Sequence, residues 1–308
     1  MSNVLGWHTK GFYDGKVLLL EEGLDKDDCI FLDLDINRSR IRSVGHHVVA
    51  YNKRLTDELQ AKGVFQYSAC IQPNNMRGFD GRNDFQLKYP FGTIHLLVGI
   101  IHAALPDHVK IAPEGIWPLL FADGVWNNLF GYTENCLDWM EWLGITDRAH
   151  ILNRFFCGAD YTVYEIMRGL DTFLRIRDEY NAKGSFSDGR YSTGGRTKRT
   201  GHNLRITDPR GKPINLVPDS NGATFAIHQR ERDRVVGFIQ QMAKHIGWDY
   251  STEDWCWDRL CLTKLRKGDF SKGRLNNSSY MALMARHPFS LAMTSSQNIE
   301  YTEVIQPP

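Results

Sequence analysis

Short apolar runs separated by polar segments dominate the first part of the chain, and their lengths predict strands. Cys29–Leu34 (Cys-Ile-Phe-Leu-Asp-Leu) is short, apolar and rich in β-prone residues, which is typical of a buried strand. Ile41–Val49 predicts a second strand, and the polar segment Asp35–Arg40 connects the two. Phe65–Ile71 is also strand-like, whereas Val17–Leu20 suits either a short strand or the start of a helix.

Other segments carry apolar residues at the three- and four-residue spacing of a helix. Thr93–Ala104 is the clearest of these, because Pro106 prevents the pattern from continuing. The same pattern predicts helices at Leu55–Lys62, Glu134–Leu143, Tyr161–Tyr180 and Arg232–Ile246, the last of them ended by Gly247. Between helices, Pro73–Pro90 is expected to be a polar loop and Leu119–Gly124 a strand end or tight turn.

The composition of the chain changes near residue 181. Ala182–Gly211 is rich in Gly, Ser, Thr and Arg and poor in apolar residues, which predicts an exposed hairpin or linker over residues 182–212. We therefore expect two domains, residues 1–180 and a smaller C-terminal domain, residues 181–308, that closes over a cleft. The alternation of strands and helices favours an α/β fold with a mixed or mostly parallel sheet flanked by helices.

The overall composition is that of a soluble globular protein, with 42% hydrophobic and 24% charged residues. Apolar runs such as Ile94–Leu105 fall short of the roughly 20 residues that span a bilayer. The N-terminal residues lack the pattern of a secretory signal, and the six cysteines form no closely spaced pairs. We expect a cytoplasmic protein with reduced thiols and no membrane partner, while the sequence leaves the oligomeric state open.

The charge is balanced overall but not locally. The net charge is +1, which gives the whole chain no general attraction for nucleic acid. Seven Lys or Arg residues and a single acid lie between Arg190 and Lys212. Within that stretch Arg196, Lys198 and Arg199 are expected to bind phosphates of a substrate or of nucleic acid, although a solvated loop is the ordinary alternative.

Two polar groups follow two consecutive predicted strands. Asp33 and Asp35 lie at or just beyond the end of the first strand, and Gly45, His46 and His47 lie at the end of the second. Because ligands of open α/β sheets bind beyond the carboxyl ends of the strands, we expect the two groups to share one crevice. Carboxylates combined with imidazoles are typical of hydrolytic metal centres, so we expect a divalent cofactor, with Mn, Fe, Zn and Mg left open by the donor types.

Two further acids extend this set. Asp123 follows an apolar run in Phe-Ala-Asp-Gly, and Asp14 lies near the N-terminus. The expected metal ligands are Asp33, Asp35, His46, Asp123 and Asp14. Adjacent strand residues face opposite sides, so we expect one of the two histidines to bind metal and the other to orient a ligand or contact substrate. Catalytic roles are therefore expected for His46, His47 and Asp123, and substrate binding for Asn52.

The order of these residues resembles the DHH phosphoesterase family over roughly residues 8–125. The shared pattern is a strand-end acid, a segment ending in a histidine pair followed by Asn, a helix and a further strand-end Asp. The resemblance implies that Asp33 or Asp35 matches the second-motif acid, His46 and His47 the histidine pair, and Asp123 the fourth-motif acid. It also implies an α/β domain that holds two Mn²⁺ ions and hydrolyses phosphoesters or phosphoanhydrides.

The chain departs from that family pattern at several positions. Gly45 stands where the family has an acid, and the first motif is stretched to His8 and Asp14. Arg286–Ala292 resembles only weakly the Gly-His-rich segment in the second domain of the family. These departures leave open a non-catalytic nucleic-acid-binding or regulatory protein with a degenerate site.

The segment around Asp33 also resembles two other enzyme classes, the metal-dependent glycosyltransferases with Asp-x-Asp and the haloacid-dehalogenase-like phosphatases. The first class needs a nucleotide-binding half before the motif, and about 30 residues are too few to build one. The second class would have Thr or Val in place of Asn37. The favoured hypothesis is therefore a metal-dependent phosphoesterase acting on a nucleotide or a nucleic-acid-like phosphoester.

Overall fold

The computed structural model describes residues 1–80, 84–158, 160–183, 204–248, 250, 252–270, 273–295 and 298–305. Most of the predicted hairpin or linker at 182–212 lies outside these residues, and so do Arg196, Lys198 and Arg199. Among the described residues, no helix is both long enough and apolar enough to cross a membrane.

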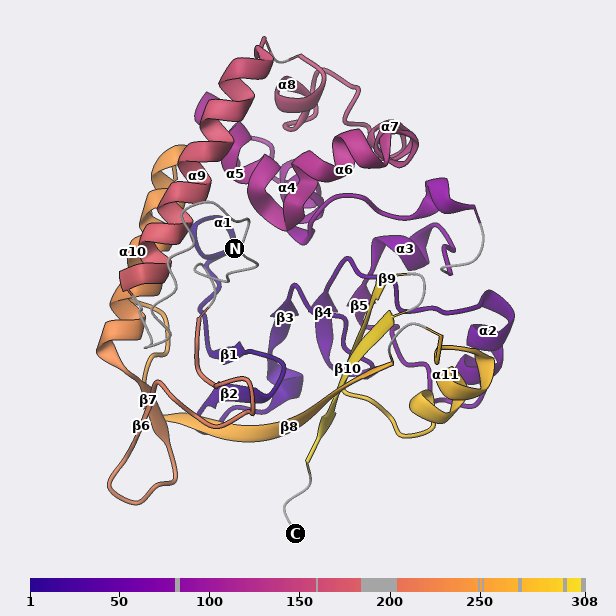
Figure 1. Ribbon diagram of the computed structural model, residues 1–308, viewed down its shortest axis with the longest axis vertical. Helices are drawn as coiled ribbons and strands as arrows, with labels where there is room; N and C mark the ends of the chain where they lie inside the picture. Colours follow the sequence, from indigo (N-terminus) through magenta and orange to yellow (C-terminus); the bar gives the residue numbers. More distant parts are fainter. Residues whose placement is uncertain are drawn as a thin grey trace.

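The described residues form two sheets, of which the larger is curved and antiparallel (Figure 1). Its main path runs through β1 (Gly11–Tyr13), β2 (Val17–Glu21), β8 (Leu260–Phe270), β10 (Asn298–Val304) and β9 (Ser290–Ser295), while β7 (Phe225–Ile227) pairs with both β8 and β6 (Leu216–Pro218). Every pairing in this sheet is antiparallel. The long strand β8 exposes many of its side chains, as expected of an antiparallel sheet with one solvated face.

The smaller sheet is parallel and contains β3 (Ile30–Leu32), β4 (Arg42–Val44) and β5 (Cys70–Ile71). Helix α2 (Lys53–Ala61) lies between β4 and β5 in the sequence. Two isolated antiparallel bridges, Ile36 to Ser290 and Val48 to Met293, connect the segments after β3 and β4 to strand β9. The N-terminal strand ends are therefore held against the C-terminal part of the chain.

The predicted fold class is wrong, because the main sheet is antiparallel and the parallel sheet is small. The alternation of apolar runs and helices correctly indicated parallel pairing for residues 30–71, but that pairing does not extend further. The pairing of β2 with β8 joins residues more than two hundred positions apart, and local periodicity carries no signal for it. The large sheet thus draws strands from both of the predicted domains, 1–180 and 181–308.

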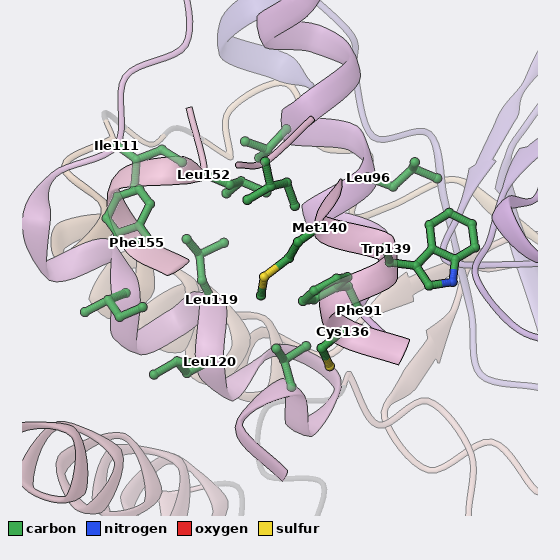
Figure 2. Close-up of a cluster of buried hydrophobic side chains, with 14 of the residues drawn as sticks. Phe91, Leu96, Ile111, Leu119, Leu120, Cys136, Trp139, Met140, Leu152 and Phe155 are labelled. Atoms are coloured by element: carbon green, nitrogen blue, oxygen red, sulfur yellow. The ribbon is translucent and has the colours of Figure 1, made fainter. Parts of the chain in front are cut away.

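Helices form the upper part of the molecule in Figure 1 and enclose the largest apolar core. They are α4 (Thr93–Ala104), α5 (Ile116–Phe121), α6 (Val125–Gly131), α7 (Thr133–Trp142), α8 (Asn153–Phe156), α9 (Val163–Lys183) and α10 (Gln229–Ile246). Figure 2 shows Phe91, Leu119, Met140, Leu152 and Phe155 gathered between these helices, and all five are buried. Burying a side chain of this size contributes about 1.5–3 kcal/mol, which makes this core a rigid base for the chain segments on its edge.

The remaining short elements connect these parts. They are α1 (Ser2–Leu5), α3 (Pro73–Met76), α11 (Asn277–Met284) and the 3-10 turns Lys26–Asp28, Phe85–Leu87, Pro113–Gly115 and Ala122–Gly124. Helix α11 packs with α2 over the second apolar cluster, which includes Leu55, Tyr280 and Leu291.

The predicted helices are confirmed, and the bounds of Thr93–Ala104 match those of α4. Gly247 ends α10 in the left-handed conformation, with φ 75°, as a C-terminal glycine should. Of the two structures expected within Leu119–Gly124, the strand end is wrong, because Leu119 lies in α5, whereas the tight turn is confirmed by the 3-10 turn Ala122–Gly124. An apolar run of this length does not by itself distinguish a strand from a buried helix.

Candidate metal centre

The parallel register of β3 and β4 brings two chain segments to the same edge of the small sheet. Leu32 pairs with Val44, so Asp33 and Gly45 leave the sheet side by side. His46 and His47 follow directly and do not form a regular strand, which allows both imidazoles to turn to one side. Their ring centroids lie 4.2 Å apart.

Asp33, His46 and Asp123 form the cluster on which the candidate site rests. One ligand atom from each of the three lies within 4.8 Å of the other two, and among the described residues this is the one group with metal-site spacing. Nδ1 of His46 lies 3.2 Å from Oδ1 of Asp33, and Nε2 of His46 lies 3.9 Å from Oδ1 of Asp123. Asp123, which the sequence places more than seventy residues from His46, is brought there by the junction of α5 and α6.

Both carboxylates of the cluster sit on unusual backbone. Asp33 has φ 61° and Asp123 has φ 53°, in the left-handed region that residues other than glycine rarely adopt. A Cβ on Gly92 would lie 2.0 Å from Oδ2 of Asp123, so the glycine leaves the space that this carboxylate fills. Strained backbone persists where the surroundings determine it, and such positions cluster at functional sites.

The charges of the cluster interact strongly. Partial burial would raise the pKa of Asp33, but the hydrogen bonds from His46 and Thr93 and the charge of His46 outweigh it and lower that pKa to about 2. Burial raises the pKa of Asp123, with His46 opposing and the negative charge of Asp33 reinforcing the shift. Because 59% of the Asp33 side chain is exposed, solvent screens these interactions. Two nearby carboxylates of this kind attract a cation.

Asp35 lies outside this cluster and forms a pair with His47 instead. Its side chain is fully buried, and Oδ2 lies 3.1 Å from Nδ1 of His47 and accepts a hydrogen bond from the His47 backbone N–H at 3.3 Å. The amide of Gln72 donates to Oδ1 of Asp35. Burial would lower the pKa of His47, but the hydrogen bond to Asp35 and the surrounding carboxylates outweigh burial and raise it. A buried carboxylate that holds Nδ1 of a partly exposed histidine fixes the orientation of that imidazole.

Two other predicted residues have evident local roles. Oδ1 of Asp14 accepts hydrogen bonds from the backbone N–H groups of Lys16 and Val17 in the turn between β1 and β2, and Oδ2 accepts one from Thr207. The structure therefore does not bring Asp14 to the cluster of Asp33, His46 and Asp123. Asn52 is the N-cap of α2, where its Oδ1 accepts a hydrogen bond from the backbone N–H of Leu55 at 3.2 Å.

Several weaker sequence signals also separate in space. His8 lies 3.8 Å from the exposed Asp254. The segment after His287 packs beside the chain that follows β3, because Asn37 and Arg38 bind the carbonyl groups of Phe289 and Pro288. Trp255 and Trp257 stack in an apolar cluster, while Trp248 packs against the helical core, so the three tryptophans do not form a common surface for bases.

The sequence analysis missed two residues that hold the cluster in place. Thr93 begins α4 and hydrogen-bonds both Asp33 and His46. His95 is buried, and its ring bonds the backbone N–H of Gly92 and the carbonyl of Leu119. It thereby joins the start of α4 to the helix that leads to Asp123. A glycine followed by threonine at the start of a predicted helix was the available signal for Thr93.

A cavity lies elsewhere, beside α2. It measures about 520 Å³ and is lined by polar residues such as Lys53, Gln60 and Gln66 together with Phe65 and Phe79. None of the cluster residues lines it. The chemistry of the donor set rather than the depth of a pocket therefore marks the candidate metal centre.

The residues present suit a divalent ion. Two carboxylates and one imidazole are donors that Mn²⁺ and Zn²⁺ both accept. The 3.9 Å between Nε2 of His46 and Oδ1 of Asp123 is too long for a hydrogen bond, yet two metal–ligand bonds of about 2.0–2.2 Å reach across it. Three protein ligands leave further coordination positions for water or a substrate oxygen, as catalytic sites require.

No family model, curated protein or solved structure matches this chain. The site must therefore be interpreted from its own chemistry.

Proposed function

We propose that this chain is a metal-dependent phosphoesterase acting on a nucleotide or a nucleic-acid-like phosphoester. The observation that carries the proposal is the approach of Asp33, His46 and Asp123 to within 4.8 Å at the carboxyl ends of two parallel strands. A bound divalent ion would stabilise charge on a phosphoryl oxygen and make hydroxide available near neutral pH. Mn²⁺ is the first choice of metal for this donor set, with Mg²⁺ and Zn²⁺ as alternatives.

The residues of the chain divide into two roles in this proposal. Asp33, His46 and Asp123 hold the ion, and His47 faces the substrate. Because Asp35 binds Nδ1 of His47 and leaves one third of that side chain exposed, Nε2 of His47 is available to a leaving-group oxygen. His47 then donates a proton to that oxygen or orients it by a hydrogen bond.

The burial of Asp35 argues against the two alternatives that use Asp-x-Asp, the metal-dependent glycosyltransferases and the haloacid-dehalogenase-like phosphatases. Those classes need both carboxylates of the motif at the ligand, whereas Asp35 is 2% exposed and its oxygens bind His47 and Gln72. Asn37 is also engaged in structure, because its amide bridges the carbonyl of Val64 and the backbone N–H of Gln66.

A metal titration followed by an activity assay tests the proposal. Calorimetry should detect Mn²⁺ binding to the wild type, and Asp33→Ala and His46→Ala should weaken binding by about tenfold or more. The matched control Asp107→Ala, which removes an exposed acid just after α4, should bind as the wild type does. With Mn²⁺, the wild type should hydrolyse bis(p-nitrophenyl) phosphate or a dinucleotide, and the two site variants should not. Absence of Mn²⁺ binding by the wild type, or binding unaffected by both substitutions, would remove the hydrolase hypothesis.

Partners and location complete the proposal. We propose a phosphorylated small molecule or nucleic acid as the substrate and the cytoplasm as the compartment. The alternative of a nucleic-acid-binding protein without turnover predicts that oligonucleotides bind while no phosphoester is hydrolysed in any of the three metals.

A further inference from the structure

Thr93 occupies a buried position between two residues of the candidate metal centre. Only 5% of the surface of Thr93 is exposed. Oγ1 lies 2.7 Å from Oδ1 of Asp33 and 2.8 Å from Nδ1 of His46. The N-cap of α4 is Gly92, so the Thr93 hydroxyl is not needed to cap the helix. Its two contacts therefore serve the site.

The positions of the protons in Thr93, Asp33 and His46 follow from the number of hydrogen-bond donors and acceptors that each side chain has. A carboxylate oxygen can only accept, so the single proton of the Thr93 hydroxyl is donated to Asp33. The hydroxyl then has only lone pairs left for its second contact. The ring nitrogen that faces it, Nδ1 of His46, must carry a hydrogen and donate. The 3.2 Å approach of the same Nδ1 to Asp33 agrees with this assignment, since Oδ1 of Asp33 is also an acceptor.

We propose that Thr93 is a positioning residue that fixes His46 in the tautomer protonated on Nδ1, so that the lone pair of Nε2 faces Asp123. In the neutral ring only one nitrogen carries the hydrogen, and Nε2 therefore becomes the metal-binding atom. The metal-binding role of Nε2 rests on the proposed function, whereas the assignment of the tautomer does not. Nε2 and Oδ1 of Asp123 are then two acceptors facing each other across 3.9 Å, an arrangement that a cation stabilises.

His95 provides an internal comparison two residues along the same helix. Nδ1 of His95 accepts from the backbone N–H of Gly92, so its Nε2 must donate to the carbonyl of Leu119. His95 is therefore assigned the opposite tautomer. Nuclear magnetic resonance of the imidazole nitrogens distinguishes the two forms, and one spectrum reports both residues.

The first test uses the full chain without metal. Long-range ¹H–¹⁵N correlation spectra should show His46 protonated on Nδ1 and His95 protonated on Nε2, with the signals assigned through His46→Ala and His95→Gln. Thr93→Ser keeps the hydroxyl and should preserve the His46 pattern. Thr93→Val keeps the shape without the hydroxyl and leaves Nδ1 of His46 only the longer contact with Asp33, so the His46 signals should shift toward a mixture of the two tautomers while His95 keeps its own. A wild-type His46 protonated on Nε2, or a pattern unchanged in Thr93→Val, would overturn the proposal.

The second test measures Mn²⁺ affinity in the same variants. Loss of the residue that orients a ligand typically weakens metal binding by about 10–100-fold, and we expect this for Thr93→Val and near wild-type affinity for Thr93→Ser. If the wild type binds Mn²⁺ and Thr93→Val binds it equally well, the positioning role of Thr93 is wrong while the proposed function stands. If the wild type binds no Mn²⁺, the proposed function is wrong, and the spectra alone decide the tautomer.

Discussion

The carboxylate of Asp35 fills the space directly beside the α-carbon of Gly45. A Cβ at position 45 would lie 2.1 Å from Oδ1 of Asp35, far closer than such atoms approach each other. A side chain at position 45 and the inward orientation of Asp35 therefore exclude each other. Glycine fits position 45 because Asp35 already occupies the volume that a side chain would need.

We predict that Gly45→Ala lowers the free energy of unfolding by about 1–3 kcal/mol, the usual cost of overpacking a filled site. The added methyl group must displace a buried carboxylate that holds His47. Urea unfolding measures the effect. Gly131→Ala is the matched control, because nothing lies within 4 Å of the position its methyl group would take. Equal stability of Gly45→Ala and the wild type would show that Asp35 is free to move away.

We predict that Asp33→Asn affects Mn²⁺ binding, whereas Asp35→Asn affects the rate of hydrolysis. Asp33→Asn should weaken Mn²⁺ binding strongly, because it removes a charged ligand. Asp35→Asn should leave Mn²⁺ affinity close to that of the wild type and lower the rate of phosphoester hydrolysis, because His47 loses the carboxylate that orients it. The same variant should lower the pKa of His47, since Asp35 is what raises it. Strong loss of Mn²⁺ binding in Asp35→Asn would instead make Asp35 a ligand.

The local part of this site could be predicted from the sequence. The apolar run before Asp33 and the run before His46 correctly indicated neighbouring parallel strands whose ends meet. The approach of Asp123 to His46 also agrees with the set expected from the residue types. These features depend on short-range patterns and on the preference of carboxylates and imidazoles for shared ions.

The rest of the site and the large antiparallel sheet depend on contacts that no local sequence pattern encodes. Asp33 and Asp35 are equivalent in the sequence, but only the left-handed turn at Asp33 and the burial of Asp35 give them different roles. The antiparallel sheet could not be predicted either, because only two of the eleven residues of β8 are buried and its partner β2 lies at the other end of the chain. Asp123 was expected at a strand end or tight turn, and it lies in a 3-10 turn that follows a helix rather than a strand.

The basic segment supplies a prediction that is independent of the metal centre. Replacement of Arg196, Lys198 and Arg199 by alanine should weaken binding to a single-stranded oligonucleotide and reduce the salt dependence of that binding by about one unit per lost phosphate contact. Fluorescence anisotropy over a range of salt concentrations measures both quantities. A matched triple alanine variant of Arg54, Lys62 and Arg148, which are exposed, controls for the change in net charge. Unchanged affinity in the first variant would argue against a nucleic-acid partner.

His95 makes the stability of the fold depend on pH in a predictable direction. Its burial lowers the pKa to about 4, from the ordinary histidine value of 6.5. The unfolded chain therefore takes up a proton on this residue as the pH falls below about 6.5, whereas the folded chain does so only near pH 4. The contribution of a neutral, buried His95 is fully present above pH 6.5 and is lost progressively between these two values. The loss amounts to about 3 kcal/mol, since each unit of pKa difference corresponds to about 1.4 kcal/mol.

We predict that urea unfolding of the wild type between pH 7 and pH 4 shows this loss and that His95→Gln lacks it. Glutamine at position 95 retains a donor and an acceptor for Leu119 and Gly92 but does not titrate. His108→Gln, at an exposed position, should keep the wild-type slope. If His95→Gln follows the same curve as the wild type, His95 is not held neutral in the folded chain. Its link between the start of α4 and the helix leading to Asp123 would then also need revision, because a protonated ring could not accept the N–H of Gly92.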